Sequence, residues 1–319
     1  MTKALLLLVA VAAFGLQVSP ARAQLARTFV SSVNGNDANN CSQATPCRTF
    51  QAAHDNTFDQ GEITVLDPGG YGTLTIRKSI SVVNDGVGEA GVLVSGGAVG
   101  IEVAALNAYV NLRGITVNGT GAGTGLRLDN AFALTITNCV FRNLTGNGIE
   151  YRPNNPGSLT ITDTLIADNG GSGILVKSRS SGAVAVSLGR VEMYNNSQDG
   201  FTLDSSEQPG SVNAAITDSV AANNFGAGFA NRGTPPANAV NSPLTGQGQL
   251  MVTRSVSSNN NFGFFQDQNN VFLVVGESIV GMNFDGARGG TAGVFTYQDN
   301  YSFGNSGNGN AFVQAVSKQ

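Results

Sequence analysis

Apolar and polar residues alternate along the chain in a pattern that is repeated several times. The segment LTITNCVFRNLTGNGIEY (134–151) is followed by the similar segment LTITDTLIADNGGSGILV (159–176). Further copies, some weaker, occupy residues 110–128, 186–203, 214–231, 250–267 and 273–287. Each copy contains an alternating stretch, a short apolar pair, an Asn-rich turn, and a Gly followed by an apolar residue. Alternation with a period of two is typical of strands, and each copy has room for three short ones.

A repeat of this length with almost no helical pattern predicts a solenoid of stacked coils. With three strands in each coil, the solenoid is a parallel β-helix. About ten coils from residue 63 onward would form a rod of about 50 Å, at roughly 4.8 Å per coil. We expect one column of apolar residues to face the interior: Leu112, Ile136, Ile161, Leu188, Ile216 and Val252.

Two further columns of residues recur at the turns. Asparagine tolerates left-handed backbone angles, and stacked Asn side chains can hydrogen-bond along the rod. The Asn column comprises Asn143, Asn169, Asn196, Asn224, Asn260 and Asn283. A Gly column, where we expect positive φ, comprises Gly125, Gly148, Gly173, Gly200, Gly228, Gly263 and Gly286. Both columns indicate architecture rather than chemistry.

The first 23 residues have a different pattern. Lys3 precedes an apolar run over residues 4–16, and Ala21-Arg22-Ala23 provides a small-x-small cleavage site. These features predict a secretory signal peptide over residues 1–23, and the alternative is a membrane anchor. The run is shorter than the ~20 residues of a membrane span, so we expect cleavage before Gln24 and a secreted or periplasmic product. No later segment is apolar enough to cross a membrane.

Residues 24–62 combine a predicted strand, a polar loop and a helix. Cys41 and Cys47 flank the loop, and in an exported protein a disulfide between them is expected, with two free thiols as the alternative. Phe50, Ala53 and Phe58 have helical spacing and would give the helix one apolar face.

The third cysteine, Cys139, and the single histidine, His54, carry side chains that could take part in catalysis. Cys139 falls on an apolar-pair position of a repeat, which predicts a small buried core residue. His54, the single histidine, lies on the predicted helix without a partner pattern for catalysis, so we expect a surface or packing role.

The repeats and the segment TFVSSVNGNDANNCSQATPCRTFQAA (28–53) resemble the right-handed parallel β-helix superfamily of pectate-lyase-like and related carbohydrate-active proteins. The segment is similar to the start of secreted β-helix proteins, in which a strand and a polar loop precede a helix that plugs the rod. The resemblance implies an N-terminal capping helix and a β-helix over residues 63–319. It leaves the activity open, because one scaffold hosts many functions.

Composition restricts the partners. Charged residues make up 12% of the 319 residues and the net charge is −4, which excludes the basic face that nucleic-acid binding requires. Hydrophobic residues make up 41%, enough for a sizeable core. The oligomeric state is left open.

The segments between each Gly and the next repeat lengthen along the chain. They grow from 11 positions (148 to 159) to 22 positions (228 to 250), and then fall to 10 (263 to 273). Scaffolds commonly carry function on such loops. We therefore expect a groove that is walled on one side by the loops 152–158, 177–183, 204–211 and 232–249.

Charged residues border this groove at one position of each coil: Arg152, Lys177, Asp204, Arg232 and Asp267. One interpretation is a charge ladder, in which opposite charges on neighbouring coils stabilise the sheet. The other is a binding groove for an acidic or polyhydroxylated sugar chain, with Arg152, Lys177 and Arg232 as ligands. The sequence leaves both open.

Catalysis is equally open. The resemblance implies that a lyase would need clustered Asp residues for Ca²⁺ and a basic residue, and that a hydrolase would need a close carboxylate pair. Asp199 and Asp285 are expected about three coils apart, roughly 14 Å, which is too far for such a pair. A cluster of Asp67, Arg77, Lys78 and Asp85 would suit either a metal or a plain turn.

We therefore favour an exported, non-catalytic polysaccharide-binding or structural protein without a metal or other cofactor. The alternative is a pectate-lyase-like polysaccharide lyase or a glycoside hydrolase, and a lyase would bring Ca²⁺.

Overall fold

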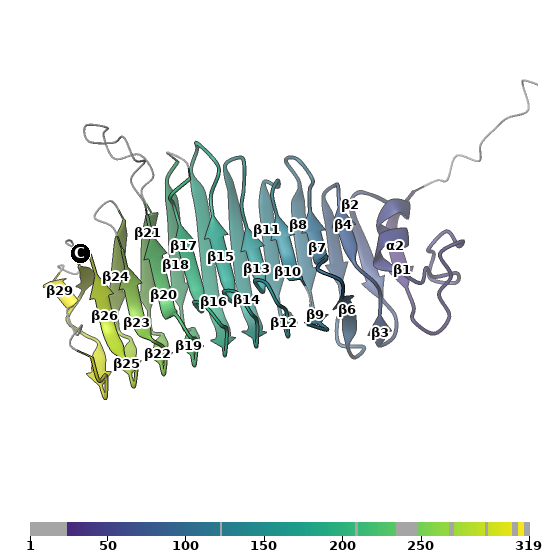
Figure 1. Ribbon diagram of the computed structural model, residues 1–319. Helices are drawn as coiled ribbons and strands as arrows, with labels where there is room; N and C mark the ends of the chain where they lie inside the picture. The colour runs from purple at the N-terminus through teal and green to yellow at the C-terminus, as the bar shows by residue number, and fades with distance from the viewer. Residues whose placement is uncertain are drawn as a thin grey trace, which may run out of the picture.

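The chain forms a rod of stacked parallel strands with a short helix at its N-terminal end (Figure 1). The computed structural model describes residues 24–121, 123–207, 210–233, 248–267, 271–290, 293–307 and 312–315. The predicted signal peptide over residues 1–23 lies outside the described residues. No helix of the described segments has the length and apolar character of a membrane span.

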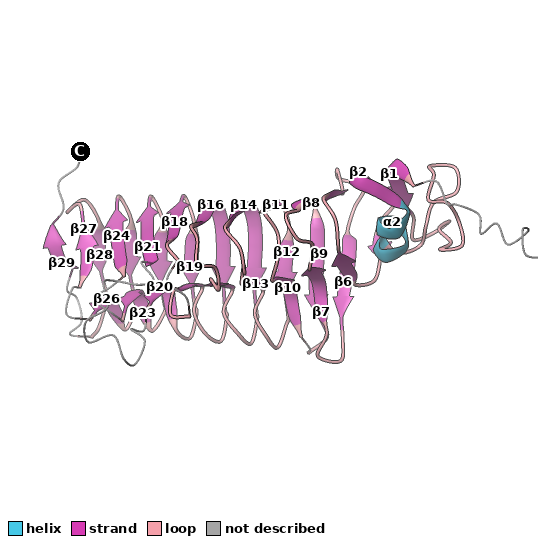
Figure 2. Cartoon of the chain, turned by 90° about the horizontal axis from the view of Figure 1, so that it is seen from above, coloured by secondary structure: helices cyan, strands magenta, loops and turns pink. Residues whose placement is uncertain are grey.

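Three faces run along the rod (Figure 2). The first face contains β1 (Leu25–Val30), β2 (Thr57–Val65), β5 (Ile80–Val83), β8 (Tyr109–Arg113), β11 (Ala133–Thr137), β18 (Val212–Thr217), β21 (Gly248–Thr253), β24 (Phe272–Gly276), β27 (Val294–Thr296) and β29 (Phe312–Ala315). The second contains β3 (Gly69–Gly70), β6 (Ala90–Val94), β9 (Ile115–Gly119), β12 (Val140–Arg142), β19 (Val220–Ala222), β22 (Val256–Ser258), β25 (Ile279–Gly281) and β28 (Tyr301–Phe303). Two long strands, β14 (Gly157–Ala167) and β16 (Val184–Tyr194), bend from the first face into the second and join them into one sheet.

The third face is a separate sheet of nine strands within the described residues. It contains β4 (Leu74–Ile76), β7 (Val99–Val103), β10 (Thr124–Leu128), β13 (Ile149–Tyr151), β15 (Ile174–Lys177), β17 (Phe201–Asp204), β20 (Ala227–Arg232), β23 (Phe262–Gln266) and β26 (Asp285–Gly289). About nine parallel turns therefore stack along the rod, which confirms the predicted three-strand coils.

The interior of the rod is a set of apolar columns. The column predicted from Leu112 to Val252 is confirmed, since none of its six residues is more than 1% exposed. The backbone register places like residues on neighbouring coils, as in the pairs Leu112–Ile136 and Ile136–Ile161. Each coil therefore buries its apolar face against the next one, which no single coil could do alone.

The Asn column consists of two adjacent rows with different roles. In the buried row each Nδ2 donates to the Oδ1 of the next coil at 2.9–3.2 Å, along Asn169, Asn196, Asn224, Asn260, Asn283 and Asn305. Asn143 does not belong to it, because Leu144 occupies the buried position of that coil. Asn143 lies one residue earlier, with φ 59°, in an exposed row that continues through Asn195, Asn223 and Asn259. The prediction of a single Asn column was wrong only in grouping Asn143 with the buried residues. Asn143 combines the expected left-handed backbone with a hydrogen bond along the rod, from its Nδ2 to Asn118 Oδ1 at 2.8 Å.

Glycine recurs in this column because the neighbouring coil leaves no space for a side chain, not because the backbone needs an unusual conformation. None of its seven members has positive φ, so that prediction was wrong. A Cβ at Gly148 would lie 2.5 Å from Ile166 Cγ2 and 2.7 Å from the carbonyl oxygen of Gly173. Glycine lets the third strand of each coil approach the interior and the next coil closely.

Helix α2 (Phe50–Asn56) covers the N-terminal end of the rod. Phe50 and Ala53 are buried, and the Phe50 ring packs on Tyr71 with centroids 4.9 Å apart. Phe58 does not belong to the apolar face, because the helix ends at Asn56 and Phe58 lies half exposed on β2. The predicted Cys41–Cys47 disulfide is present and closes the loop beside the helix.

The lone thiol and the lone imidazole are both buried. Cys139 is 1% exposed, as predicted for a core residue, and burial raises the pKa of its thiol to about 11. His54 is 4% exposed, which settles the choice between a surface and a packing role. Its Nε2 accepts the Arg77 backbone N–H at 3.2 Å, and this bond ties the helix to the first coil.

Candidate functional site

The charged column predicted on the third face is formed by the sheet itself. The apolar residues three positions before the members of this column are buried and stand in register across five coils: Ile149, Ile174, Phe201, Phe229 and Phe264. Lys177, Asp204 and Arg232 are likewise in register on three successive strands. Their side chains are 17–37% exposed, so the column borders solvent.

The cations in the first half of this column are engaged by carboxylates. Arg152 follows β13 directly and lies 3.0 Å from Asp129 on the preceding coil and 3.3 Å from Glu150 on β13. Lys177 lies 3.3 Å from Asp204 on the following coil and 3.1 Å from Glu207. These contacts have the form of the charge ladder, in which opposite charges alternate between neighbouring coils.

A second layer of ion pairs lies in the loops that follow the third face. Arg179 contacts Glu207 at 3.0 Å and links two neighbouring loops. Burial lowers the pKa of Lys177, but its ion pairs with Glu207 and Asp204 outweigh burial and raise it. The tallest predicted wall, residues 232–249, lies outside the described residues from 234 to 247.

Arg232 turns out of its column toward a carboxylate that the sequence did not single out as a site residue. Its guanidinium lies 2.8 Å from Asp199 on the preceding coil and 4.7 Å from the ring centroid of Phe265 on the following one. The Asp199 side chain is 5% exposed, and it also accepts the Ala227 N–H at 2.7 Å and the Thr202 hydroxyl at 2.8 Å. In the sequence, Asp199 is distinguished only by its place directly before the Gly of its coil, and this place does not predict the ion pair with Arg232.

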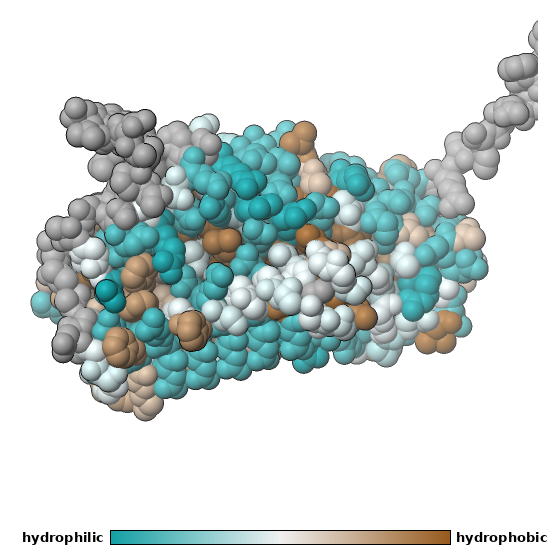
Figure 3. All heavy atoms as spheres, in the orientation of Figure 1, coloured by the Kyte–Doolittle hydropathy of each residue, from teal (hydrophilic) through white to brown (hydrophobic). Residues whose placement is uncertain are grey.

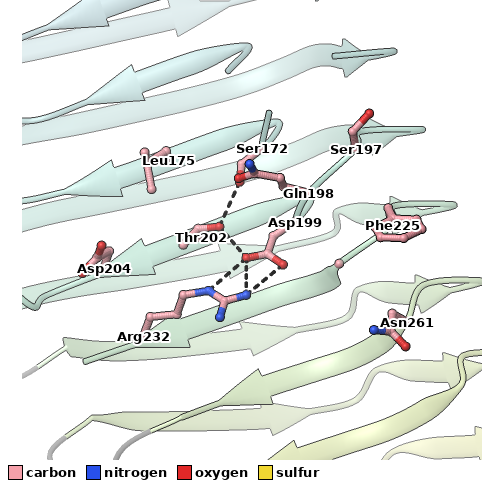
Figure 4. Close-up of a pocket in the computed structure, with 11 residues that line it drawn as sticks. Ser172, Leu175, Ser197, Gln198, Asp199, Thr202, Asp204, Phe225, Arg232 and Asn261 are labelled. Carbon is pink, nitrogen blue, oxygen red and sulfur yellow. Dashed lines mark hydrogen bonds and ion pairs between the residues drawn. The ribbon is translucent and has the colours of Figure 1, made fainter. Parts of the chain in front are cut away.

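A hollow of about 550 Å³ opens around this ion pair. Its floor carries the hydroxyl groups of Ser172 and Thr202, which lie 3.2 Å apart. Figure 4 shows Arg232 and Asp199 reaching toward each other across it, with Phe225 on the side away from Asp204. Phe225 is 82% exposed. Hydroxyl, carboxylate and guanidinium groups thus lie next to an open aromatic ring.

Asp267 is the last member of the predicted column. It accepts the Gly233 backbone N–H at 2.9 Å. Burial raises the pKa of its carboxyl, and the neighbouring Asp204 adds to that rise. All five predicted residues lie along one face, and Arg232 stands between the coils of Asp204 and Asp267. Arg152, Lys177 and Arg232 each contact a carboxylate, whereas Asp267 accepts a backbone N–H.

The described residues contain no group of three or more His, Cys, Asp or Glu side chains that could hold a metal ion. Asp67, from the cluster that would suit a metal or a turn, accepts hydrogen bonds from the Ser32 N–H at 2.6 Å and the Tyr71 hydroxyl at 3.0 Å. Asp85 instead pairs with Arg113 at 3.1 Å. The donor set for the Ca²⁺ of a lyase is therefore not assembled in these parts of the chain.

Comparison with known proteins agrees with this architecture. Residues 32–188 match the family described as a right-handed beta helix region. The chain is a right-handed parallel β-helix. No curated protein matches its sequence.

Two solved structures superpose on this β-helix over most of its length. A pectate lyase, Pel9A, is 23% identical with a TM-score of 0.61, and the match covers 92% of this chain and 80% of that one. A rhamnogalacturonan lyase is 14% identical with a TM-score of 0.58, covering 80% and 73%. At these identities the likeness shows the fold alone.

Proposed function

We propose that this β-helix protein binds a hydroxyl-rich polysaccharide on its third face and does not cleave it. The observation that carries the proposal is the hollow beside Phe225, where an 82% exposed aromatic ring adjoins the Ser172, Thr202 and Asp199 side chains. Sugar rings combine an apolar C–H face with hydroxyl edges, so an aromatic ring next to hydrogen-bonding groups suits them.

The charges favour a neutral chain over a polyuronate. From β7 to β23, the outer side of the third face and its loops carry seven acidic and five basic side chains, a net charge of −2: Glu102, Asp129, Glu150, Asp199, Asp204, Glu207 and Asp267 against Arg127, Arg152, Lys177, Arg179 and Arg232. Each of the three cations first considered as ligands already contacts a carboxylate. The carboxylate of a uronate would have to displace the protein carboxylate that already contacts each cation. A neutral sugar hydroxyl can hydrogen-bond to an ion pair without separating it.

The environments of the carboxylates on the third face favour binding over glycosidase catalysis. Asp199 is fully engaged by Arg232, Thr202 and the Ala227 N–H. Asp204 and Asp267 stand two coils apart, about 10 Å at the spacing of parallel strands, just beyond the range for inverting enzymes. Asp204 and Glu207 lie closer together, since both contact Lys177. Burial raises the pKa of Glu207, but its hydrogen bonds with Lys177 and Arg179 outweigh burial and lower it, which disfavours the protonated form that a general acid needs.

The proposal includes export through the signal peptide over residues 1–23, since an extended polysaccharide would be met outside the cytoplasm. Electrophoresis in native gels cast with soluble polysaccharides tests binding directly. Neutral glucans, mannans and xylans should retard the protein, and polygalacturonate should retard it less. Migration that no polysaccharide changes would overturn the proposal in favour of a purely structural role.

A matched pair of variants connects the retardation to the hollow. Thr202→Val removes one hydroxyl from the floor and should reduce retardation. Thr160→Val makes the same change on the outer side of the first face and should leave retardation unchanged.

A further inference from the structure

We propose that the bound chain lies parallel to the rod axis at the corner between the second and third faces, with two of its sugar rings stacked on Phe225 and Phe284. This inference rests on the proposed function and specifies the direction, the contacts and the minimal length of the ligand. It starts from a row of corner residues that the sequence analysis did not use.

This row, called the corner row here, lies one residue after the buried Asn row: Thr145, Gly170, Ser197, Phe225, Asn261, Phe284 and Ser306. The backbone holds it in place from coil to coil. The Phe225 N–H donates to the Asn196 carbonyl at 2.9 Å, and the Phe284 N–H donates to the Asn260 carbonyl at 3.0 Å. Both phenylalanines therefore occupy the same geometric position on their coils.

The fold itself does not require an aromatic residue in the corner row. Five of its seven positions carry Thr, Gly, Ser or Asn, and those coils stack equally well. Phe225 is 82% exposed and Phe284 is 58% exposed, so neither ring contributes much to the core. Figure 3 shows a largely hydrophilic surface on the face in view, with separate apolar patches.

Polar groups lie on both sides of Phe225. On one side is the hollow with Asp199, Thr202 and Arg232. On the other is a second hollow of about 590 Å³, lined by the amides of Asn195, Asn223 and Asn259, and Phe225 lines both. A sugar ring stacked on Phe225 would therefore meet hydrogen-bonding groups along both of its edges.

The spacing of the two rings determines how many sugars lie between them. Phe225 and Phe284 are two coils apart, about 10 Å, because coils repeat at roughly 4.8 Å. A pyranose unit of an extended 1,4-linked chain advances by about one coil, roughly 5 Å. Rings i and i+2 would then stack on the phenylalanines, and ring i+1 would lie over Asn261, whose amide can bond its hydroxyl groups. In a chain with a two-residue repeat, rings i and i+2 present the same face.

Calorimetric titration of the full chain with neutral β-1,4-linked oligosaccharides of two, three and six glucose or mannose units tests this arrangement. The trisaccharide is the shortest that spans both rings, so affinity should rise at least tenfold from two units to three and change little beyond. Phe284→Ala should reduce trisaccharide affinity at least tenfold and leave disaccharide binding at Phe225 nearly unchanged. Phe225→Ala should weaken both, and Phe225→Trp should retain both.

Phe58→Ala is the matched control, because Phe58 is a half-exposed phenylalanine on β2 near the opposite end of the rod. It should change neither affinity nor the thermal midpoint. Binding by the wild type that Phe284→Ala does not alter would overturn the corner arrangement while the proposed function stands. If none of the neutral probes binds at millimolar concentration, both proposals fail. Capture of hexagalacturonate alone would replace the neutral chain by an acidic one.

Discussion

At the scale of single residues, Asn196 shows how a polar side chain can stabilise the inside of a rod. Its Nδ2 donates to Asn224 Oδ1 at 2.9 Å, and its Oδ1 accepts from Asn169 at 2.9 Å. Both bonds are buried, so removing the amide takes one hydrogen bond from each neighbour. Asn169 Nδ2 then keeps the Phe141 carbonyl at 3.4 Å, and Asn224 Oδ1 keeps the backbone N–H of residue 196 at 3.1 Å. A buried group without its hydrogen bond costs far more than the net value of the bond itself.

Asn196→Ala should therefore lower the free energy of unfolding by about 1–3 kcal/mol, measured by chemical denaturation. Asn195→Gly is the control, because Asn195 is exposed with φ 54° and glycine adopts that conformation without strain. The control should stay within about 0.5 kcal/mol of the wild type. Equal losses from the two variants would show that the buried row does not carry this stability.

At the same scale, the sequence predicts which residues recur but not why. Asn143 lies nine positions after the start of its copy and Asn169 ten positions after the start of its own, so only Asn169 falls in the buried row. Leu144 takes the equivalent buried position, but the sequence does not say which of the two positions faces inward. Arg232 has Asp199 and Asp204 on the preceding coil and Asp267 on the following one. The sequence does not predict that its guanidinium contacts Asp199, because this contact depends on the conformation of the Arg232 side chain. Phe225 and Phe284 were overlooked because they interrupt a polar turn instead of repeating in every copy.

At the scale of strands, the alternation of apolar and polar residues predicts which side chains face the interior. It does so because successive side chains of a strand point to opposite sides, and only one side of each strand is buried. Ile161 is fully buried, whereas Thr160 on the same strand, β14, pairs with Thr135 and lies on the outer side. A register slip of one residue would exchange these faces.

Ile161→Asp should prevent folding, because an unpaired carboxylate in an apolar stack costs several kcal/mol. Thr160→Asp should retain a cooperative thermal transition and the circular dichroism of a β-protein. The strand register would be contradicted if Thr160→Asp failed to fold while Ile161→Asp folded.

The helix that caps the rod should respond to acid through His54. Burial lowers its pKa below 6.5, while Asp55 opposes the shift and Lys78 and Arg77 add to it. Because Nε2 accepts the Arg77 N–H, the folded state favours the neutral imidazole. As the pH falls below about 6.5, the unfolded chain takes up a proton that the folded chain resists, so stability decreases.

The thermal midpoint of the wild type should therefore fall more between about pH 7.5 and pH 5 than that of His54→Gln, which does not titrate in this range. The comparison isolates His54 from the carboxyl groups, which titrate in both proteins. Parallel midpoint curves for the two proteins would show that His54 does not couple the cap to pH.

At the scale of the whole molecule, the protein is a rod with one end capped and a polar third face. Its proposed place is outside the cytoplasm, where intact-mass analysis should find a chain that starts at Gln24. A mass that retains residues 1–23 would contradict export by a cleaved signal peptide. Ion pairs line the third face, and the hollow beside Phe225 is the proposed binding site.

The central claim is that the rod holds a polysaccharide without breaking it. The most direct measurement is to incubate the protein with a neutral hexasaccharide at a concentration that saturates binding, and then to determine the mass of all recovered sugar. The account predicts measurable affinity and a single hexasaccharide mass, unchanged by added Ca²⁺. Shorter fragments, or fragments lighter by one water, would contradict it and identify the protein as a hydrolase or a lyase.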